Sequence, residues 1–188
     1  MRNREKLLAY ALIGALTLSS AGTVNAATSS PVEGKTPVTK NNVTPTVVKG
    51  TDTVTANVKK NGTAVITATP KSASKKTVKI GKKITYKKVA YTVTVINGNA
   101  FKKCKKATTI ILPATIKRIN KKAFTGAKKL KKIRINISKN ITVKKGAFKG
   151  LSTKKMKIVV NKSTTAKQLK KLQKTFKKAG FRGKVVKA

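Results

Sequence analysis

A dipeptide recurs at regular intervals in the second half of the chain: Ala100-Phe101, Ala123-Phe124 and Ala147-Phe148. The intervals are 23 and 24 residues, and the flanking positions repeat as well. A branched aliphatic residue precedes each phenylalanine by five residues, and a small or apolar residue follows it by three: Ile96, Ile119 and Val143, then Cys104, Ala127 and Leu151. A unit of this length cannot bury its apolar face alone. The period therefore predicts stacked units that share one continuous ladder of apolar side chains.

Each repeat continues into a short stretch of alternating apolar residues, which is typical of a β-strand. The apolar positions are Ile110 and Leu112, Ile133 and Ile135, and, after one inserted residue, Ile158 and Val160. Because successive side chains of a strand point to opposite faces, the residues between them should point outward. The extended sheet of stacked repeats commonly binds partners. The candidate binding face is therefore Thr109, Ile111, Lys132, Arg134, Lys157 and Val159.

The run from Ile96 to Ile119, INGNAFKKCKKATTIILPATIKRI, resembles a BspA-like leucine-rich repeat, whose unit reads I-x4-F-x2-C-x2-L-x2-I-x-L-P-x-x-[IV]-x2-I. The family's positions are occupied by Ile96, Phe101, Cys104, Ile110, Leu112, Pro113, Ile116 and Ile119. Ala107 stands where leucine is usual, and the second unit has Ala127 for cysteine and Asn136 for proline. The third unit is degenerate after Leu151, and the resemblance covers about residues 90–162.

This resemblance implies a mainly β solenoid with an α cap. We expect an array of about three units, preceded by a β-hairpin N-terminal cap and closed by a C-terminal amphipathic helix. Relatives of this kind are secreted or surface-displayed bacterial proteins, and some are implicated in adhesion. The resemblance therefore implies a non-enzymatic binding or adhesion protein at the bacterial cell surface. Its partner would be a host matrix or cell-surface macromolecule, or an anionic wall polymer.

The chain divides by composition into five segments. Residues 1–26 are predicted to be a signal peptide, because a basic start, an apolar run and Val24-Asn25-Ala26 follow in order. Residues 27–50 are predicted to be a Thr/Pro-rich linker with little order. Residues 51–95 should form a β-rich cap region, 96–162 the repeats, and 163–188 a capping helix and tail. No later stretch is long and apolar enough to span a membrane, so we expect a secreted protein that its charge retains at the cell surface.

Two secondary-structure patterns flank the repeats. Strands over residues 53–58 and 63–67 are joined by Asn61-Gly62, which is a strong hairpin signal, and further strands are expected over 77–80 and 91–96. Residues 165–179 have helical spacing, with Ser163 or Thr164 as the N-cap and Gly180 just past the end. This basic amphipathic helix could bind an anionic membrane, but closing the exposed end of the array is the favoured interpretation.

The chain is poor in catalytic side chains. It has 46 Lys and Arg residues against 3 Asp and Glu, no His and one Cys, for a net charge of +43. Residues 53–188 contain no carboxylate side chain. Acid–base catalysis usually needs His or a carboxylate, and metal sites need several His, Cys or carboxylate ligands. We therefore expect no catalytic residue, no metal site and no cofactor. Ser138 and Ser152 lie near lysines, which means little in so basic a chain, and Cys104 is expected to be buried rather than reactive.

The charge itself leaves two alternatives open. A cationic surface attracts polyanions without reading their sequence, which would make the chain a generic binder of teichoic acid, anionic glycan or nucleic acid. Without Trp and with only 3 Tyr and 5 Phe, it is poorly suited to stacking the bases of single strands specifically. The other alternative is that the lysines only keep the protein soluble.

Overall fold

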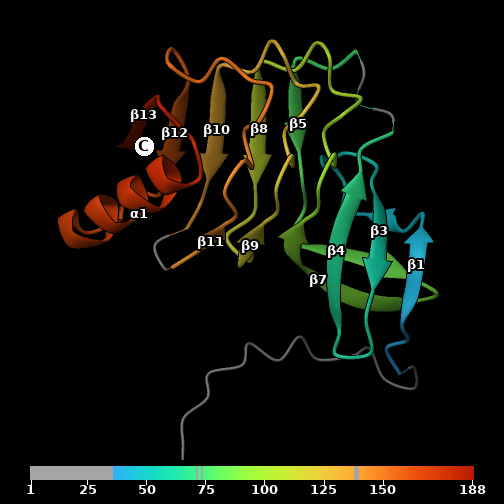
Figure 1. Ribbon diagram of the computed structural model, residues 1–188. Coiled ribbons are helices and arrows are strands. Elements are labelled where there is room, and N and C mark those ends of the chain that lie inside the picture. Colours follow the sequence, from blue (N-terminus) through green and yellow to red (C-terminus); the bar gives the residue numbers. More distant parts are fainter. Residues whose placement is uncertain (1–35, 71, 73, 138–139) are drawn as a thin grey trace, which may run out of the picture.

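The computed structural model describes residues 36–70, 72, 74–137 and 140–188 (Figure 1). The predicted signal peptide, the start of the predicted linker and Ser138 lie outside the described residues. The regular secondary structure of the described chain consists of β-strands and one α-helix near its C-terminal end. No helix among the described residues is long and apolar enough to cross a membrane.

Five parallel strands form one sheet along the repeats: β5 (Thr77–Lys79), β8 (Thr109–Leu112), β10 (Lys132–Ile135), β12 (Lys157–Val160) and β13 (Lys184–Lys187). The three strands expected from the repeats are β8, β10 and β12, and they pair in register. In each of them the predicted inward residues are buried. The sheet has one more strand at each end than the three predicted units supply, because β5 and β13 pair with β8 and β12.

Short strands on another side of the repeats also stack in parallel. They are the end of β7 (Val89–Ile96), β9 (Arg118–Ile119) and β11 (Thr142–Val143). The chain therefore alternates between a long strand of the five-stranded sheet and a short strand of this second stack (Figure 1). One hydrogen bond between side chains links two successive turns: Asn120 Nδ2 donates to Asn97 Oδ1 at 2.9 Å.

The phenylalanines of the recurring dipeptide form the stacked ladder that their spacing predicts. The Phe101 and Phe124 rings lie 5.3 Å apart with planes inclined by 5°, and the Phe124 and Phe148 rings lie 5.3 Å apart at 4°. Phe176 and Phe181 continue the stack beyond Phe148 in tilted orientations. All five phenylalanines of the chain thus belong to one buried stack.

The turn before each stacked phenylalanine contains a residue in the left-handed backbone region: Asn99 at φ 61°, Lys122 at φ 60° and Gly146 at φ 76°. The N–H of Asn99 donates to the Lys122 carbonyl, and the N–H of Lys122 donates to the Gly146 carbonyl. Gly146 in turn donates to the carbonyl of Ala179, which directly follows the helix. The end of the helix therefore takes the place of a further turn.

Helix α1 (Ala166–Lys178) begins one or two residues later than predicted. Thr165 is the N-cap and forms a capping box with Gln168, so the predicted N-cap at Ser163 or Thr164 is wrong. Thr164 is unavailable as a cap because it is buried and its hydroxyl donates to the Ile137 carbonyl. The apolar face buries Leu172 and Phe176, and the opposite face exposes lysines: Lys167, Lys170, Lys171, Lys174, Lys177 and Lys178.

The N-terminal part contains the predicted hairpin, formed by β3 (Thr55–Val58) and β4 (Thr63–Ala68), with Gly62 at φ 70°. A second hairpin, between β6 (Lys83–Tyr86) and β7, was missed by sequence reasoning. Its turn places Lys87 and Lys88 at positive φ, where Asn-Gly is usual, so the chain lacks the expected signal. Because β7 also pairs with β4 and β9, this part is continuous with the repeats.

Part of the predicted linker is ordered instead. Residues 40–47 form β1 (Lys40–Val43), which pairs with β3, and β2 (Thr46–Val47), which pairs with β6. The prediction of little order through residue 50 is therefore wrong for these strands. Pro37 and Pro45 lie outside both strands and so remove no ladder hydrogen bond, while Val43 is 5% exposed and joins the core.

Candidate binding face of the parallel sheet

The strand register brings the predicted binding residues together in two rows. Lys132 lies beside Thr109 on one side and Lys157 on the other. Arg134 lies in the same way between Ile111 and Val159. All six candidate residues thus lie on neighbouring strands of one sheet, which Figure 1 shows running across the repeats.

The outer strands extend both rows. Thr77 and Lys184 lengthen the first, and Lys79 and Val186 lengthen the second. Sequence reasoning missed these four positions because no Ala-Phe dipeptide precedes their strands. The alternation around the buried Val78 and Val185 is a weak signal that could have indicated them.

The second row combines a charged residue with apolar neighbours. Arg134 is exposed, while Ile111 and Val159 are half-buried. A guanidinium can bind carboxylates through two hydrogen bonds and can also stack on flat groups, and the flanking aliphatic side chains offer apolar contact. This arrangement suits contact with a macromolecule, because arginine is enriched where interfaces concentrate their binding energy.

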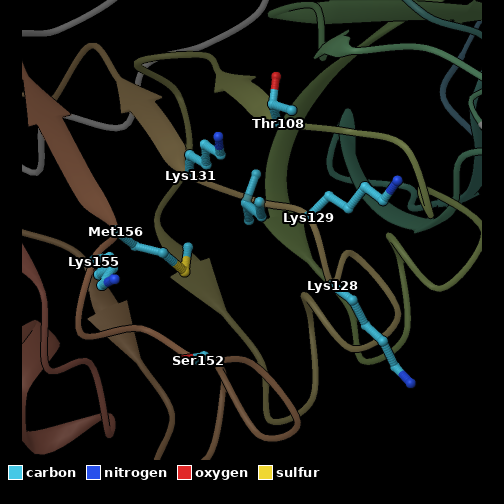
Figure 2. A pocket seen from close by; sticks show the side chains of 8 residues that line it. Thr108, Lys128, Lys129, Lys131, Ser152, Lys155 and Met156 are labelled. Atoms are coloured by element: carbon cyan, nitrogen blue, oxygen red, sulfur yellow. The ribbon is translucent and has the colours of Figure 1, made fainter.

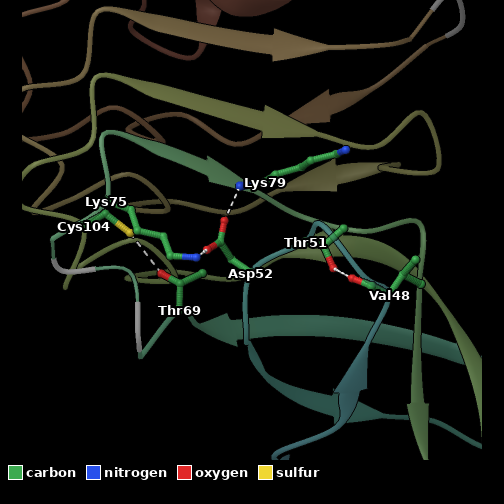
Figure 3. Close-up of polar contacts among 7 residues, drawn as sticks. All are labelled: Val48, Thr51, Asp52, Thr69, Lys75, Lys79 and Cys104. Carbon is green, nitrogen blue, oxygen red and sulfur yellow. Dashed lines mark hydrogen bonds and ion pairs between the residues drawn. The ribbon is translucent and has the colours of Figure 1, made fainter.

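One buried carboxylate, Asp52, lies against strand β5 at the end of the sheet. Asp52 is 5% exposed, forms an ion pair with Lys75 and accepts the backbone N–H of Lys79 at 2.6 Å (Figure 3). Its own N–H donates to the Lys79 carbonyl at 2.8 Å, so Asp52 joins the N-terminal part to β5. Because it is the only Asp or Glu within the described ranges, no acidic side chain is exposed on the surface described.

The lone cysteine is buried, as its position in the repeat predicts. Cys104 is fully buried, and its Sγ lies 3.0 Å from the hydroxyl of Thr69 (Figure 3). Burial raises the pKa of the Cys104 thiol, although the Thr69 hydrogen bond opposes this effect. The thiol is therefore protonated at neutral pH. A separate point concerns metal binding: no cluster of three or more His, Cys, Asp or Glu residues occurs in the part of the chain described.

A second feature lies where strands β10 and β12 begin. A cavity of about 320 Å³ is lined by Thr108, Lys128, Lys129, Leu130, Lys131, Ser152, Lys155 and Met156 (Figure 2). Ser152, considered above for its lysine neighbours, is exposed at this cavity. No acidic side chain is among the residues that line the cavity, so its chemistry is that of a cationic surface.

A protein-family model described as BspA type Leucine rich repeat region (6 copies) matches residues 75–176, more than half of the chain. The match begins just before β5 and ends within α1, so it extends beyond residues 90–162, over which the repeat pattern resembles the family. It includes the strands β5, β8, β10 and β12 of the candidate face. No curated protein and no solved structure matches the chain significantly.

Proposed function

The chain belongs to the BspA-type leucine-rich repeat family, and on this premise we propose that it is an exported, non-enzymatic adhesion protein that binds its partner through the parallel sheet. The family suggests a protein-binding or adhesion role in bacteria. The proposal adds the place of action and the surface used. In this account the repeats form a short solenoid whose end is closed by α1.

The observation that carries the proposal is the second row of the sheet face. Arg134 lies on the middle strand, with Ile111 and Val159 on either side and Lys79 and Val186 beyond them. Such a row places Arg134 between two aliphatic side chains that a partner can cover, with a second cation, Lys79, further along the row and lysines in the adjoining row. Residues in this position usually contribute most of the binding free energy of an interface.

The size of the face indicates what else the partner must contact. Five strands spaced about 4.8 Å apart span roughly 19 Å, and four residues extend about 13 Å along a strand. The flat area is then roughly 250 Å², well below the roughly 800 Å² that each partner buries in a standard interface. The partner therefore extends over neighbouring turns, where exposed lysines form a cationic rim that favours an acidic partner.

Export and retention are supported by the N-terminal sequence and the charge. Arg2, Arg4 and Lys6 precede an apolar run that ends in small residues, as in a secretory signal peptide. Without residues 1–26 the chain has 43 Lys and Arg residues against 2 Asp and Glu, a net charge of +41, and anionic polymers of a cell wall would hold such a protein by charge alone. The partner would then be a host matrix or cell-surface macromolecule that meets the protein there.

A second candidate function is generic polyanion binding without a shaped site. The exposed lysines and the single buried carboxylate, Asp52, favour it. In that case the sheet face would be only scaffold, and affinity would depend on how many lysines are present rather than on which ones.

A pair of arginine variants separates these candidates. Arg134 on β10 and Arg118 on β9 are both exposed, so Arg134→Ala and Arg118→Ala remove the same charge from different sheets. Binding to whole cells and to immobilised host matrix protein is measured at moderate salt for both variants. The proposal predicts that Arg134→Ala weakens binding by about 2 kcal/mol, a hot-spot magnitude, and that Arg118→Ala has almost no effect. Equal losses would contradict a shaped site and favour the charge-based alternative.

A further inference from the structure

Three consecutive turns of the repeats carry a lysine pair at the same structural position. The pairs are Lys105-Lys106, Lys128-Lys129 and Lys154-Lys155, and all six side chains are exposed. Buried residues flank each pair: Cys104 and Ala107, Ala127 and Leu130, Thr153 and Met156. The core thus anchors both ends of each pair and directs the two lysines to solvent. We name these six residues the lysine ledge.

Backbone hydrogen bonds hold the turns of the ledge side by side. The N–H of Lys131 donates to the Thr108 carbonyl at 2.9 Å, and the N–H of Lys157 donates to the Lys131 carbonyl at 2.9 Å. Successive pairs are therefore separated by about one strand spacing, roughly 4.8 Å. The turns that precede β8, β10 and β12 lie next to one another at the end of the sheet where these strands begin (Figure 1). The ledge is thus a row of cations that crosses the strands.

The ledge adjoins the cavity of about 320 Å³ at the start of β10 and β12. Lys128, Lys129 and Lys155 belong to both, and Figure 2 shows Lys128 and Lys129 on one turn and Lys155 on the neighbouring one. The cavity also presents the exposed hydroxyl of Ser152, which can donate a hydrogen bond to an anion. The buried side chains of Leu130 and Met156 line it as well.

The ledge lysines have no acidic partner among the residues that the structure describes. Among the described residues the one ion pair joins Lys75 to Asp52, and neither belongs to the ledge. Six like charges on adjacent turns repel one another, and a polyanion that bridges them relieves this repulsion and releases counterions. Lysine is a common ligand of phosphate, to which it presents a compact charge.

The aromatic residues indicate which polyanion fits. All five phenylalanines lie in the buried stack and Tyr91 is buried, while Tyr86 belongs to β6, which is not part of the five-stranded sheet. No aromatic side chain is therefore exposed on the ledge on which a base could stack, although proteins that bind single-stranded nucleic acid rely on such platforms. We propose that the lysine ledge binds a base-free phosphodiester chain, such as a polyol phosphate polymer, across the end of the sheet where β8, β10 and β12 begin.

The ledge lies beside the two rows of the proposed adhesion surface, among the turns that carry its cationic rim. The ledge lies in the turns that precede the strands, whereas the two rows of the candidate face lie on the strands themselves. One molecule could bind a phosphate polymer at the ledge and a macromolecule on the sheet. The rows and the ledge can be varied separately, because no ledge lysine belongs to the rows.

The test removes equal charge from two places. One variant carries Lys128→Gln, Lys129→Gln and Lys155→Gln at the ledge, and the control carries Lys170→Gln, Lys171→Gln and Lys174→Gln on the exposed face of α1. Binding of labelled poly(glycerol phosphate) to the purified protein is measured by fluorescence anisotropy over a salt series. Single-stranded oligothymidine with the same number of phosphates is the comparison probe. Circular dichroism melting verifies that each variant is folded.

The proposal predicts that the ledge variant loses about tenfold in affinity for poly(glycerol phosphate), while the control loses less than about twofold. The slope of log affinity against log salt should decrease by about 2 for the ledge variant. Replacing the same three lysines by arginine should keep the affinity, which separates lost charge from lost folding. Equal losses in the two glutamine variants, tighter binding of oligothymidine, or no binding at low salt would each overturn the proposal.

Discussion

Replacing Phe124 by leucine tests whether the ring stack stabilises the repeats beyond the burial of each ring. Phe124 has a stacked ring on both sides, at 5.3 Å from Phe101 and from Phe148, whereas Phe101 has one stacked neighbour. Both side chains are fully buried, so leucine removes a similar amount of apolar surface at each position. The comparison of Phe124→Leu with Phe101→Leu therefore isolates one aromatic pair.

The expected difference follows from these contacts. An aromatic pair contributes about 0.5–1.5 kcal/mol beyond area burial. With a further cost of about 1 kcal/mol for the lost volume, Phe124→Leu should cost about 3 kcal/mol and Phe101→Leu about 2 kcal/mol. For a protein of this size, a difference of about 1 kcal/mol corresponds to roughly 2–4 °C in Tm.

Urea unfolding followed by circular dichroism is the suitable assay. Guanidinium chloride would screen the repulsion among the lysines and so change the quantity being measured. Urea leaves ionic strength constant across the titration. If Phe101→Leu costs as much free energy of unfolding as Phe124→Leu, stacking adds nothing to burial and the reasoning is refuted.

Three further predictions concern the turn, the thiol and the charge. Lys122 occupies left-handed backbone at φ 60° and Lys121 does not. The change in free energy of unfolding, measured in urea, should therefore be about 1 kcal/mol more favourable for Lys122→Gly than for Lys121→Gly. Equal changes for the two variants would contradict the role of the turn. A thiol reagent should label Cys104 far more slowly in the folded protein than in urea, because burial raises the pKa of the thiol and keeps it protonated at neutral pH; similar rates would show that Cys104 is accessible. The Tm should rise from very low to moderate salt as self-repulsion is screened, and an unchanged or falling Tm would count against that repulsion.

The periodic part of the fold was predictable because each unit buries apolar side chains at the same positions. The spacing of Phe101, Phe124 and Phe148 indicated the stack, and the alternation at Lys132 and Arg134 indicated the outward face. These inferences need only a regular period and a buried side. The register between strands, which creates the two rows, follows from the same period, since units of nearly equal length align their strands.

The remaining features depend on tertiary context. Lys87 and Lys88 adopt positive φ in a hairpin turn, a conformation that lysine rarely signals in a sequence. Phe181 continues the stack although no alanine directly precedes it, because α1 brings it to the end of the array. The position of Asp52 against β5 joins distant parts of the chain, and no local pattern marks it.

The same context explains the order found within the predicted linker. The segment around Val43 has weak strand propensity and nearby prolines, yet it pairs with β3, whose other side pairs with β4. Local composition describes the isolated segment, whereas the sheet provides the hydrogen bonds that order it.

The most direct test of the central claim is a binding panel at low and at high salt. The purified protein is offered whole cells, host matrix protein, teichoic acid, heparin and DNA. A shaped sheet face predicts that binding to one macromolecule survives high salt, while binding to simple polyanions decreases steeply. If every interaction disappears at high salt, the sheet face has no partner of its own, and the account of an adhesion surface centred on Arg134 is wrong.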